Sequence, residues 1–497
     1  MSRYILAVDQ GTTGTTALLF DAELAIRGRC NVEFPQHFPH PSWVEHDLEE
    51  IWTSVGTAVR GAIQQAKAKG SEIAAIGIAN QRETTCLWER GEGARPVGRA
   101  IVWQDRRTAD ECAKLKKKGL EKAINRKTGL VLDPYFSATK LQWMLKNISG
   151  AKERAKRGQL AFGTIESYLL YRMSGEHRTD VSNASRTLLM DIRKCRWDED
   201  LLKTFGIPRE VLPEIFPSAV EYGKTKHFFD LPDGIPITGL AGDQQAALFG
   251  QACFSTGEAK CTYGTGAFIL ANTGNTPVFS KHKLLTTVGW QLGDKVTYCL
   301  EGSAFIAGAA VQWLRDGIQI IGKSGEVEAL ASQVPDSDGV MFVPALSGMG
   351  APHWLPGATG MFTGITRRTT KAHIARATLD GVAFQVRELL EAMTKDFGKK
   401  LKEVRVDGGA SLNNLLMQFQ ADLLGVDVVR SYISETTALG SGLQAGLAIG
   451  FWQNQQEIAK KWRAGRTFHP QIKAADRKQQ IARWDKTIAA VTLLSKP

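Results

Sequence analysis

Residues 4–20, YILAVDQGTTGTTALLF, place an aspartate, two glycines and four threonines between two apolar runs. The runs Tyr4 to Val8 and Ala17 to Phe20 favour strands and predict a β-hairpin closed by the threonine-rich bend. Glycine lets the backbone approach a ligand closely, and threonine hydroxyls with consecutive backbone N–H groups can donate to an oxyanion. The bend is therefore either an ordinary hairpin turn or a phosphate site, with Asp9 placed to hold a hydrated Mg²⁺ ion.

Two later apolar runs also stop abruptly at polar residues. Ile73 to Ala79 reads as a strand buried within a sheet and ends at Asn80 to Thr85. Ile235 to Gly242 ends at Asp243-Gln244-Gln245, before a helix-like stretch. Strands that stop at clustered polar residues mark the carboxyl edge of a sheet, where α/β proteins bind ligands.

The second half of the chain repeats this organisation. Residues 259–272, AKCTYGTGAFILAN, again carry a glycine-threonine bend between apolar stretches. Residues 403–407 read as a strand, followed by Gly408-Gly409 and a helix expected to start near Leu412. The echo suggests two related lobes that share a cleft, although so short a similarity could also arise by chance. The basic tail from residue 456 to 497 reads as largely helical.

Length and composition agree with a folded α/β protein of two large lobes. The chain has 497 residues, 43% of them hydrophobic, and 49 glycines. A chain of this length is too long for a single ordinary hydrophobic core. We place the lobes at residues 1–252 and 253–497. Seven cysteines with no Cys-x-x-Cys pair argue against a disulfide framework and a zinc site. No segment resembles a signal peptide or a membrane span, so we expect a cytoplasmic protein without membrane insertion.

The formal net charge of +11 raises the question of a nucleic-acid partner. The basic residues gather in stretches such as 114–118 and 152–157, which read as solvated helix faces. We therefore expect no nucleic-acid binding. A net positive charge also favours the approach of anionic substrates.

A Walker A pattern occurs at residues 317–324, GIQIIGKS. A phosphate-binding loop of this kind follows a buried strand and opens a helix. Here the pattern follows a helical stretch, Ala309 to Leu314, and its central residues are bulky and apolar. We interpret it as a chance match.

Ten segments together resemble the FGGY carbohydrate-kinase family of the actin-like ATPase superfamily. They run from residue 7 to residue 454: AVDQGTTGTTALLF, IGIANQRETT, AIVWQDRRT, TGLVLDPYFSATK, NASRTLLM, AGDQQAALFGQ, YGTGAF, VPALSGMGAPHW, VDGGASLNN and TALGSGLQAGLAIGFWQN. The resemblance implies two actin-like (ribonuclease H-like) α/β lobes around a central nucleotide and substrate cleft. It also implies ATP-dependent phosphorylation of glycerol to sn-glycerol 3-phosphate, with Mg²⁺ as cofactor.

The same resemblance implies the roles of particular residues. The polyol would bind to Arg82, Glu83, Trp103, Tyr135, Asp243, Gln244 and Phe268. The nucleotide would bind to Thr12, Thr13, Gly14, Thr16, Thr265, Gly308, Gln312, Gly409 and Asn413. Asp9 and Asp243 would hold the metal ion, and Asp243 would be the catalytic base. For single residues, surface ion pairs, core aromatics or a helix cap would be ordinary alternatives.

Three departures from the family pattern limit what can be transferred. Thr16 stands where well-known bacterial members have an arginine. Residues 227–234 lack the glycine-rich loop with an arginine that binds fructose 1,6-bisphosphate in some relatives, so we expect weak or no inhibition by that sugar. Residues 470–477 differ from the relatives regulated by a sugar-transport phosphocarrier.

Other functions remain open at this point. The nearest alternative is a kinase of the same family that acts on a pentulose or a longer polyol, and a more distant one is a non-enzymatic actin-like scaffold. Related kinases form dimers and tetramers, so a homo-oligomer is expected.

Overall fold

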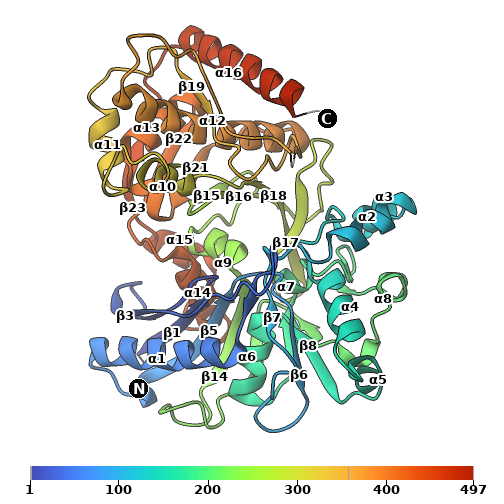
Figure 1. Cartoon of the computed structure of the whole chain (residues 1–497). Coiled ribbons are helices and arrows are strands. Elements are labelled where there is room, and N and C mark those ends of the chain that lie inside the picture. The colour runs from blue at the N-terminus through green and yellow to red at the C-terminus, as the bar shows by residue number, and fades with distance from the viewer. Residues whose placement is uncertain (1–2, 356, 496–497) are drawn as a thin grey trace.

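The computed structural model describes residues 3–355 and 357–495, which form two α/β lobes stacked one above the other (Figure 1). The first lobe contains a six-stranded sheet in the order β13-β14-β5-β1-β2-β3. Its strands are β1 (Tyr4–Gln10), β2 (Gly14–Phe20), β3 (Ile26–Glu33), β5 (Ile73–Asn80), β13 (Ala219–Lys224) and β14 (Pro236–Gly242). The second lobe contains a seven-stranded sheet in the order β17-β18-β16-β15-β21-β22-β23. Its strands are β15 (Ala259–Tyr263), β16 (Ala267–Gly274), β17 (Leu285–Leu292), β18 (Lys295–Ala304), β21 (Glu403–Asp407), β22 (Asp427–Ser431) and β23 (Ala464–Phe468).

Five two-stranded sheets and the helices complete the fold. The small sheets pair β4 (Glu45–His46) with β7 (Ala100–Ile101), β6 (Cys86–Glu89) with β8 (Leu160–Gly163), β9 (Arg178–Asp180) with β12 (Glu214–Phe216), β10 (Met190–Asp191) with β11 (Arg196–Trp197), and β19 (Met341–Val343) with β20 (Met361–Thr363). The first nine helices are α1 (Leu48–Ala66), α2 (Ala109–Lys117), α3 (Glu121–Thr128), α4 (Ser137–Asn147), α5 (Ala151–Lys156), α6 (Ile165–Ser174), α7 (Val181–Ala184), α8 (Glu199–Phe205) and α9 (Asp243–Gly250). The others are α10 (Gly308–Asp316), α11 (Glu326–Ala331), α12 (Lys371–Phe397), α13 (Asn414–Leu424), α14 (Thr436–Ala448), α15 (Gln455–Lys461) and α16 (Ala474–Leu494).

The predicted opening hairpin is confirmed. Strands β1 and β2 pair antiparallel, with Asp9 opposite Thr16. Strand β5 is parallel to β1, and β14 is parallel to β5, so that Gln10, Asn80 and Gly242 lie in register at one edge of the sheet. The threonine-rich bend, the polar segment after β5 and Asp243 therefore all leave the sheet at the same edge.

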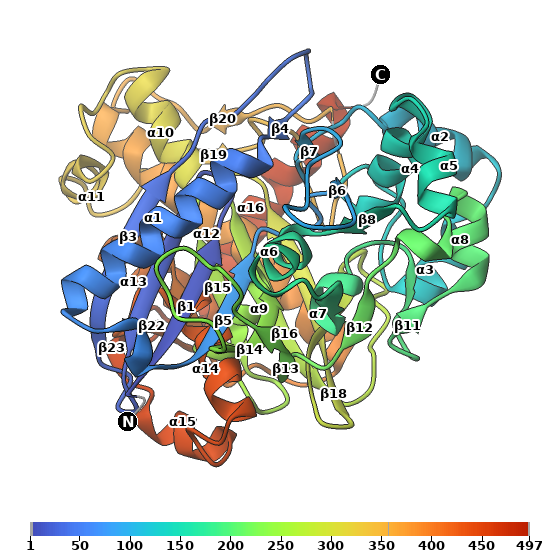
Figure 2. The ribbon, with the colours of Figure 1, turned by 90° about the horizontal axis from the view of Figure 1, so that it is seen from below.

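The second sheet repeats this arrangement, as the sequence suggested. Strands β15 and β16 form an antiparallel hairpin, and β21 is parallel to β15, with Thr262 opposite Asp407. The glycine-threonine bend after Tyr263 and the turn after Asp407 are therefore neighbours. In Figure 2, which looks along the stacking direction, strands of the second sheet are seen behind those of the first.

Two helices, α9 and α14, lie between the lobes (Figure 1). Helix α14 contacts β1, β5 and β14 of the first sheet, and α9 contacts α14 and β15 to β17. A Cβ atom on Gly440 would lie 1.8 Å from the carbonyl oxygen of Ala246, and one on Gly250 would lie 2.0 Å from that of Thr436. The glycine-rich sequence of α14 therefore allows the two helix backbones to touch.

Buried apolar residues fill each lobe and also the space between the lobes. One cluster combines Ile5, Phe20 and Leu443 with Leu270 and Trp290. Ile5 and Phe20 lie on strands of the first sheet, whereas Leu270 and Trp290 lie on strands of the second sheet. Part of the hydrophobic core is therefore shared between the lobes. Within the described residues, we find no helix that is both long enough and apolar enough to span a bilayer.

The tail is largely helical, as predicted, because α15 and α16 make up most of it. The sequence analysis did not foresee that residues 464–468 form β23, which pairs antiparallel with β22 at the sheet edge. The helix expected near Leu412 begins at Asn414, after a 3₁₀ turn over Gly409–Leu412. Asn413 caps this helix, since its Oδ1 accepts a hydrogen bond from the N–H of Leu416 at 2.9 Å.

Candidate active site

The threonine-rich bend is closed by backbone and side-chain hydrogen bonds. The N–H of Gly11 donates to the carbonyl oxygen of Gly14 at 2.9 Å. The indole Nε1 of Trp103 donates to Oγ1 of Thr12 at 2.9 Å, while Thr13 is exposed. Thr16 lies beside Asp9, and its hydroxyl accepts from the amide of Asn31 at 2.8 Å.

The second bend is joined to the start of α10. The N–H groups of Ala307 and Gly308 donate to the carbonyl oxygens of Thr265 and Gly264 at 2.8 Å and 3.0 Å. The side chain of Thr265 is exposed, and so is that of Gln312 on α10. The second bend and the start of α10 therefore present polar groups to solvent together.

The turn after β21 lies against this bend. Gly408 has a φ of +86°, and a Cβ atom there would lie 2.5 Å from the carbonyl oxygen of Tyr263. Only glycine combines that backbone angle with so close an approach. A Cβ atom on the next residue, Gly409, would meet nothing within 4 Å. The backbone at Gly409 is therefore open to a ligand.

An aromatic group connects the first bend to the second. Trp103, which donates to Thr12, packs edge-to-face on Tyr135 and Phe268, with ring centroids 5.5 Å and 6.3 Å apart. Phe268 follows the second bend by two residues. The structure thus brings predicted phosphate residues from both lobes toward predicted apolar residues of the polyol site.

Asp243 stands at the first position of α9 and contacts Arg82. Its Oδ1 lies 3.1 Å from Nε of Arg82 and accepts a hydrogen bond from the N–H of Gln244 at 2.7 Å. The Asp243 side chain is 29% exposed, whereas that of Arg82 is 2% exposed. Asp243 is therefore held by protein groups on one side and accessible to a ligand on the other.

Asp9 is a half-buried carboxylate close enough to Asp243 to feel its charge. Burial first, and then the charge of Asp243, raise the pKa of Asp9 to about 7. Its Oδ1 is buried without a hydrogen-bond partner. Two carboxylates that repel each other, one with a free oxygen, provide the hard oxygen ligands that Mg²⁺ prefers.

These residues fit a metal ion that completes its coordination with other ligands. Among the residues that the structure describes, no group of three or more His, Cys, Asp or Glu side chains could hold a metal on its own. Mg²⁺ usually takes one or two carboxylates and fills its other positions with water and substrate phosphates. Asp9 and Asp243 match that pattern.

Sequence reasoning missed two of the charged residues near Arg82, Glu301 and Arg186. Glu301 on β18 accepts from Nη1 and Nη2 of Arg82 at 2.5 Å and 3.0 Å. Arg186, which follows α7, donates to Glu83 at 2.6 Å and to Glu301 at 3.0 Å. Arg186 stood within a quoted motif, and Glu301 was the one charge in the apolar stretch YCLEGSAF. A charged residue within an apolar stretch is expected to be buried and to need a partner of opposite charge. This was the sequence signal that could have identified Glu301.

Lys260 is a further buried charge that the sequence analysis overlooked. Its ammonium group donates to Oε1 of Gln244 and, at 2.8 Å, to the hydroxyl of Thr262. Burial lowers the pKa of Lys260, although Asp407 and Asp243 act in the opposite direction. Lys260 therefore fixes the amide of Gln244 beside Asp243.

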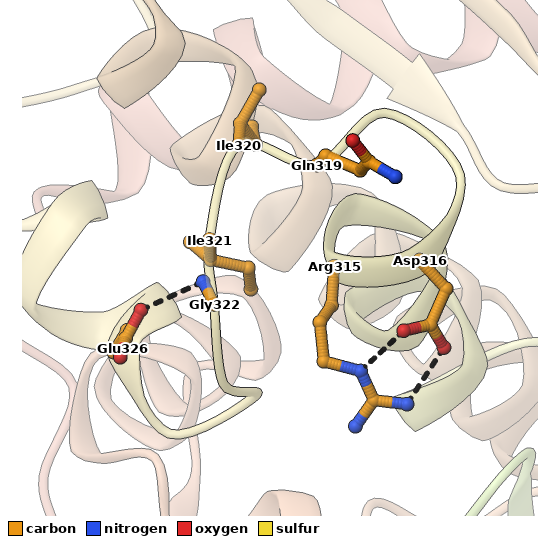
Figure 3. Close-up of a pocket in the computed structure, with 7 residues that line it drawn as sticks. All are labelled: Arg315, Asp316, Gln319, Ile320, Ile321, Gly322 and Glu326. Atoms are coloured by element: carbon orange, nitrogen blue, oxygen red, sulfur yellow. Dashed lines mark hydrogen bonds and ion pairs between the residues drawn. The ribbon is translucent and has the colours of Figure 1, made fainter.

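The Walker A-like segment has the wrong surroundings, as predicted. Residues 317–324 form a loop between α10 and α11, beside a cavity of about 810 Å³ (Figure 3). The N–H of Gly322 already donates to the carboxylate of Glu326 at 2.8 Å, and Arg315 pairs with Asp316 at 2.6 Å. A loop amide and the neighbouring arginine of α10 are thus both paired with protein carboxylates, and the loop does not form a cradle for phosphate.

Two α/β lobes with matching glycine-threonine bends, and a partly exposed aspartate between them, define a two-lobed kinase of the actin-like class. Models of the N-terminal and C-terminal domains of the FGGY family of carbohydrate kinases match residues 4–250 and 259–449. The chain belongs to this family. The resemblance seen in the sequence and the expected fold are both confirmed.

Known proteins similar to this chain include glycerol kinases. The glycerol kinase of Myxococcus xanthus is 54% identical over 98% of this chain and 99% of its own length. That of Bdellovibrio bacteriovorus is 54% identical over 99% of this chain and its whole length. The crystal structure of Plasmodium falciparum glycerol kinase with ADP superposes with a TM-score of 0.92 at 37% identity, covering 98% of each chain. Xylulose kinase from Lactobacillus acidophilus, at 23% identity and a TM-score of 0.88, shares the fold.

Proposed function

We propose that this chain catalyses the ATP-dependent phosphorylation of glycerol to sn-glycerol 3-phosphate. The observation that carries the proposal is the partly exposed Asp243, held against the buried Arg82 and close enough to Asp9 for its charge to help raise the pKa of Asp9. Glycerol kinases of similar sequence over nearly the full length support the choice of substrate.

Glycerol needs charged hydrogen-bonding groups for its hydroxyls and a flat apolar surface for its carbon chain. Arg82, Glu83, Tyr135, Asp243 and Gln244 supply the polar groups. Trp103 and Phe268, whose ring centroids are 6.3 Å apart, supply the apolar surface. A small triol fits this set better than a longer sugar, which would need further hydroxyl partners.

ATP is proposed to bind between the lobes. Thr12, Thr13, Gly14, Thr16 and Thr265 would hold its phosphates, because their hydroxyls and backbone N–H groups are suitable donors. The rest of the nucleotide would lie against Gly308, Gln312, Gly409 and Asn413. For Asn413, the side-chain carbonyl already caps α13, which leaves its amide N–H₂ for the ligand.

Phosphoryl transfer is proposed to proceed in line, with Asp243 as the base. A glycerol hydroxyl oxygen forms a bond to the γ-phosphorus while the bond to the β–γ bridging oxygen breaks and ADP leaves. Asp243 orients that hydroxyl and accepts its proton, while Arg82 fixes the position of Asp243. When bound to Asp9 and Asp243, Mg²⁺ would neutralise charge on the phosphate oxygens.

We further propose that residues 1–252 form the lobe that binds polyol and phosphate, and that residues 253–497 form the lobe that binds the nucleotide. A cytoplasmic homo-oligomer, dimer or tetramer, is proposed as the working form. The seven cysteines all carry free thiols, which is consistent with a reducing compartment.

The test is phosphorylation by the purified protein with ATP and Mg²⁺, using glycerol, longer polyols and pentuloses in parallel. We expect glycerol to be the best substrate. The Asp243→Asn variant should keep its fold and bind glycerol, but lose turnover by about three or more orders of magnitude. Near-normal turnover would refute the role of Asp243, and a preferred pentulose would favour the alternative kinase activity.

A further inference from the structure

Four charged side chains form a buried network beside the proposed polyol site. Arg82, Glu83 and Arg186 come from the first lobe, whereas Glu301 comes from β18 of the second sheet. Each of the four side chains is at most 2% exposed. The charges that border the polyol site are therefore held in part from across the boundary between the lobes.

Glu301 fixes the plane of the Arg82 guanidinium. Its two carboxylate oxygens accept from Nη1 and Nη2 of Arg82 at 2.5 Å and 3.0 Å. A two-point contact of this kind fixes both the position and the orientation of the arginine. Nε of Arg82 then points to Asp243, 3.1 Å away. The orientation that Glu301 imposes thus also sets how Arg82 meets the proposed base.

Arg186 extends the same control to Glu83. Its Nη2 donates to Glu301 at 3.0 Å, and its Nε donates to Glu83 at 2.6 Å. Glu83 has a φ of +61°, an uncommon backbone angle for a residue other than glycine. Its conformation therefore depends on neighbouring groups, and Arg186 is the nearest charged one.

The network is balanced, with two cations and two anions. Burial alone would raise the pKa of Glu301, but Arg186 and Arg82 together lower it. Burial raises the pKa of Glu83, although the same two arginines oppose it. Glu301 is the more firmly ionised carboxylate, and its loss would leave two buried arginines with less negative charge than they need.

We infer that Glu301 is a positioning residue of the polyol site, acting from the opposite lobe directly on Arg82 and through Arg186 on Glu83. This inference rests on the proposed function. Without Glu301, the nearest carboxylate to Arg82 is Asp243, so the guanidinium shifts toward the base and leaves its place beside the polyol. Binding of the polyol and turnover then fall, while binding of the nucleotide does not change.

The test compares three variants by steady-state kinetics. In Glu301→Gln, we expect the KM for glycerol to rise by about tenfold or more and kcat to fall, with the KM for ATP within about twofold of wild type. Glu301→Asp keeps the charge and should be intermediate. The matched control is Glu403→Gln on β21 of the same sheet, which removes a carboxylate paired with Arg405 at 2.7 Å, and it should leave both KM values unchanged.

A double variant separates positioning from a purely structural role. Arg186→Gln with Glu301→Gln leaves Arg82 and Glu83 as a neutral pair, so the thermal midpoint should recover relative to Glu301→Gln. The KM for glycerol should stay raised. If Glu301→Gln lowers the midpoint but leaves the KM for glycerol within about twofold of wild type, Glu301 serves stability only and the inference is wrong.

The same experiments keep the inference apart from the proposed function. If the wild-type protein prefers another polyol, the assignment of glycerol as substrate fails. The variants are then compared by their KM for the preferred polyol instead of their KM for glycerol. A wild-type protein that neither phosphorylates nor binds any polyol, as measured by calorimetry, would overturn both.

Discussion

At the scale of single residues, Glu166 is a buried carboxylate that the proposed site does not use. Its Oε1 accepts from the hydroxyls of Thr164, Ser167 and Thr179 at 2.8, 3.1 and 2.7 Å. Its Oε2 is buried without a partner. Burial raises the pKa of Glu166 to about 7, and the charge of Asp180 adds to this while the hydroxyls act against it.

A raised carboxyl pKa makes stability depend on pH in a definite direction. The Glu166 carboxyl binds a proton more tightly in the folded state than in the unfolded state. Protonated Glu166 therefore contributes to the free energy of unfolding, and this contribution is complete below pH 4.5 and is lost as the pH rises through about 7. The loss is on the order of 3 kcal/mol when Glu166 is fully ionised. Glu166→Gln imitates the protonated form and should be more stable than wild type at pH 8 but not at pH 4.5.

Thermal unfolding at both pH values measures this effect. The control Glu221→Gln, on the exposed part of β13, should show no pH-dependent difference from wild type. A gap between Glu166→Gln and wild type that is equal at both pH values would show that Glu166 does not titrate differently on folding.

The site residues that could be predicted from the sequence are marked by a pattern of neighbouring residues, whereas those that were missed depend on contacts between distant parts of the chain. Asp9, Arg82 and Asp243 stand at or just after the ends of apolar strands, so the pattern of the chain points to them. Glu301 is separated from Arg82 by 219 positions. A strand interrupted by one charge reveals that a partner must exist, but not where it lies, because the pairing is set by the packing of two lobes.

At the scale of elements, the contact between α9 and α14 depends on residues without side chains. Gly250 and Gly440 each face a backbone carbonyl of the opposite helix at a distance that a Cβ atom could not tolerate. Because backbone cannot rotate away as a side chain can, an added methyl group must separate the helices. These helices join the two sheets, so their separation reaches both lobes.

Gly440→Ala should therefore destabilise the protein. Alanine is the better helix former by about 1 kcal/mol, but the clash with the carbonyl of Ala246 should outweigh this and leave a net loss of roughly 1–3 kcal/mol. The midpoint of urea unfolding measures the change. Gly325→Ala is the control, because its Cβ atom would meet nothing within 4 Å, and it should unfold like wild type. Equal midpoints for the two variants would contradict the close contact.

Sequence patterns predicted the strands and turns of the site better than the elements at the edges. The hairpins 4–20 and 259–272 have apolar runs on both sides of a glycine-threonine bend, so the pattern is local. Strand β23 carries exposed residues and exists because β22 offers it a free edge. That edge is a tertiary feature, and the tail alone could not predict it.

At the scale of the whole molecule, apolar packing and ion pairs join the lobes at more than one place. The shared apolar cluster and the pairs Arg29–Glu435 at 2.7 Å and Lys461–Glu23 at 2.6 Å connect the first sheet to the region of α14 and α15. Elsewhere, a cavity of about 460 Å³ separates α2 and α3 from residues 280–284 and Trp354.

Closure of the lobes is the prediction that belongs to this scale. The proposed polyol residues lie mainly in the first lobe, and the proposed nucleotide residues come from both lobes, so the two ligands together should stabilise a closed form more than either ligand alone. The radius of gyration from small-angle X-ray scattering should decrease when glycerol and a non-hydrolysable ATP analogue are both present, and less with either ligand alone. In Glu301→Gln the decrease should be smaller, because the charge that joins Arg82 to the second lobe is missing. If the radius is the same with and without both ligands, the site is already assembled in the free protein, and water must be excluded from the phosphate by local loop movement instead.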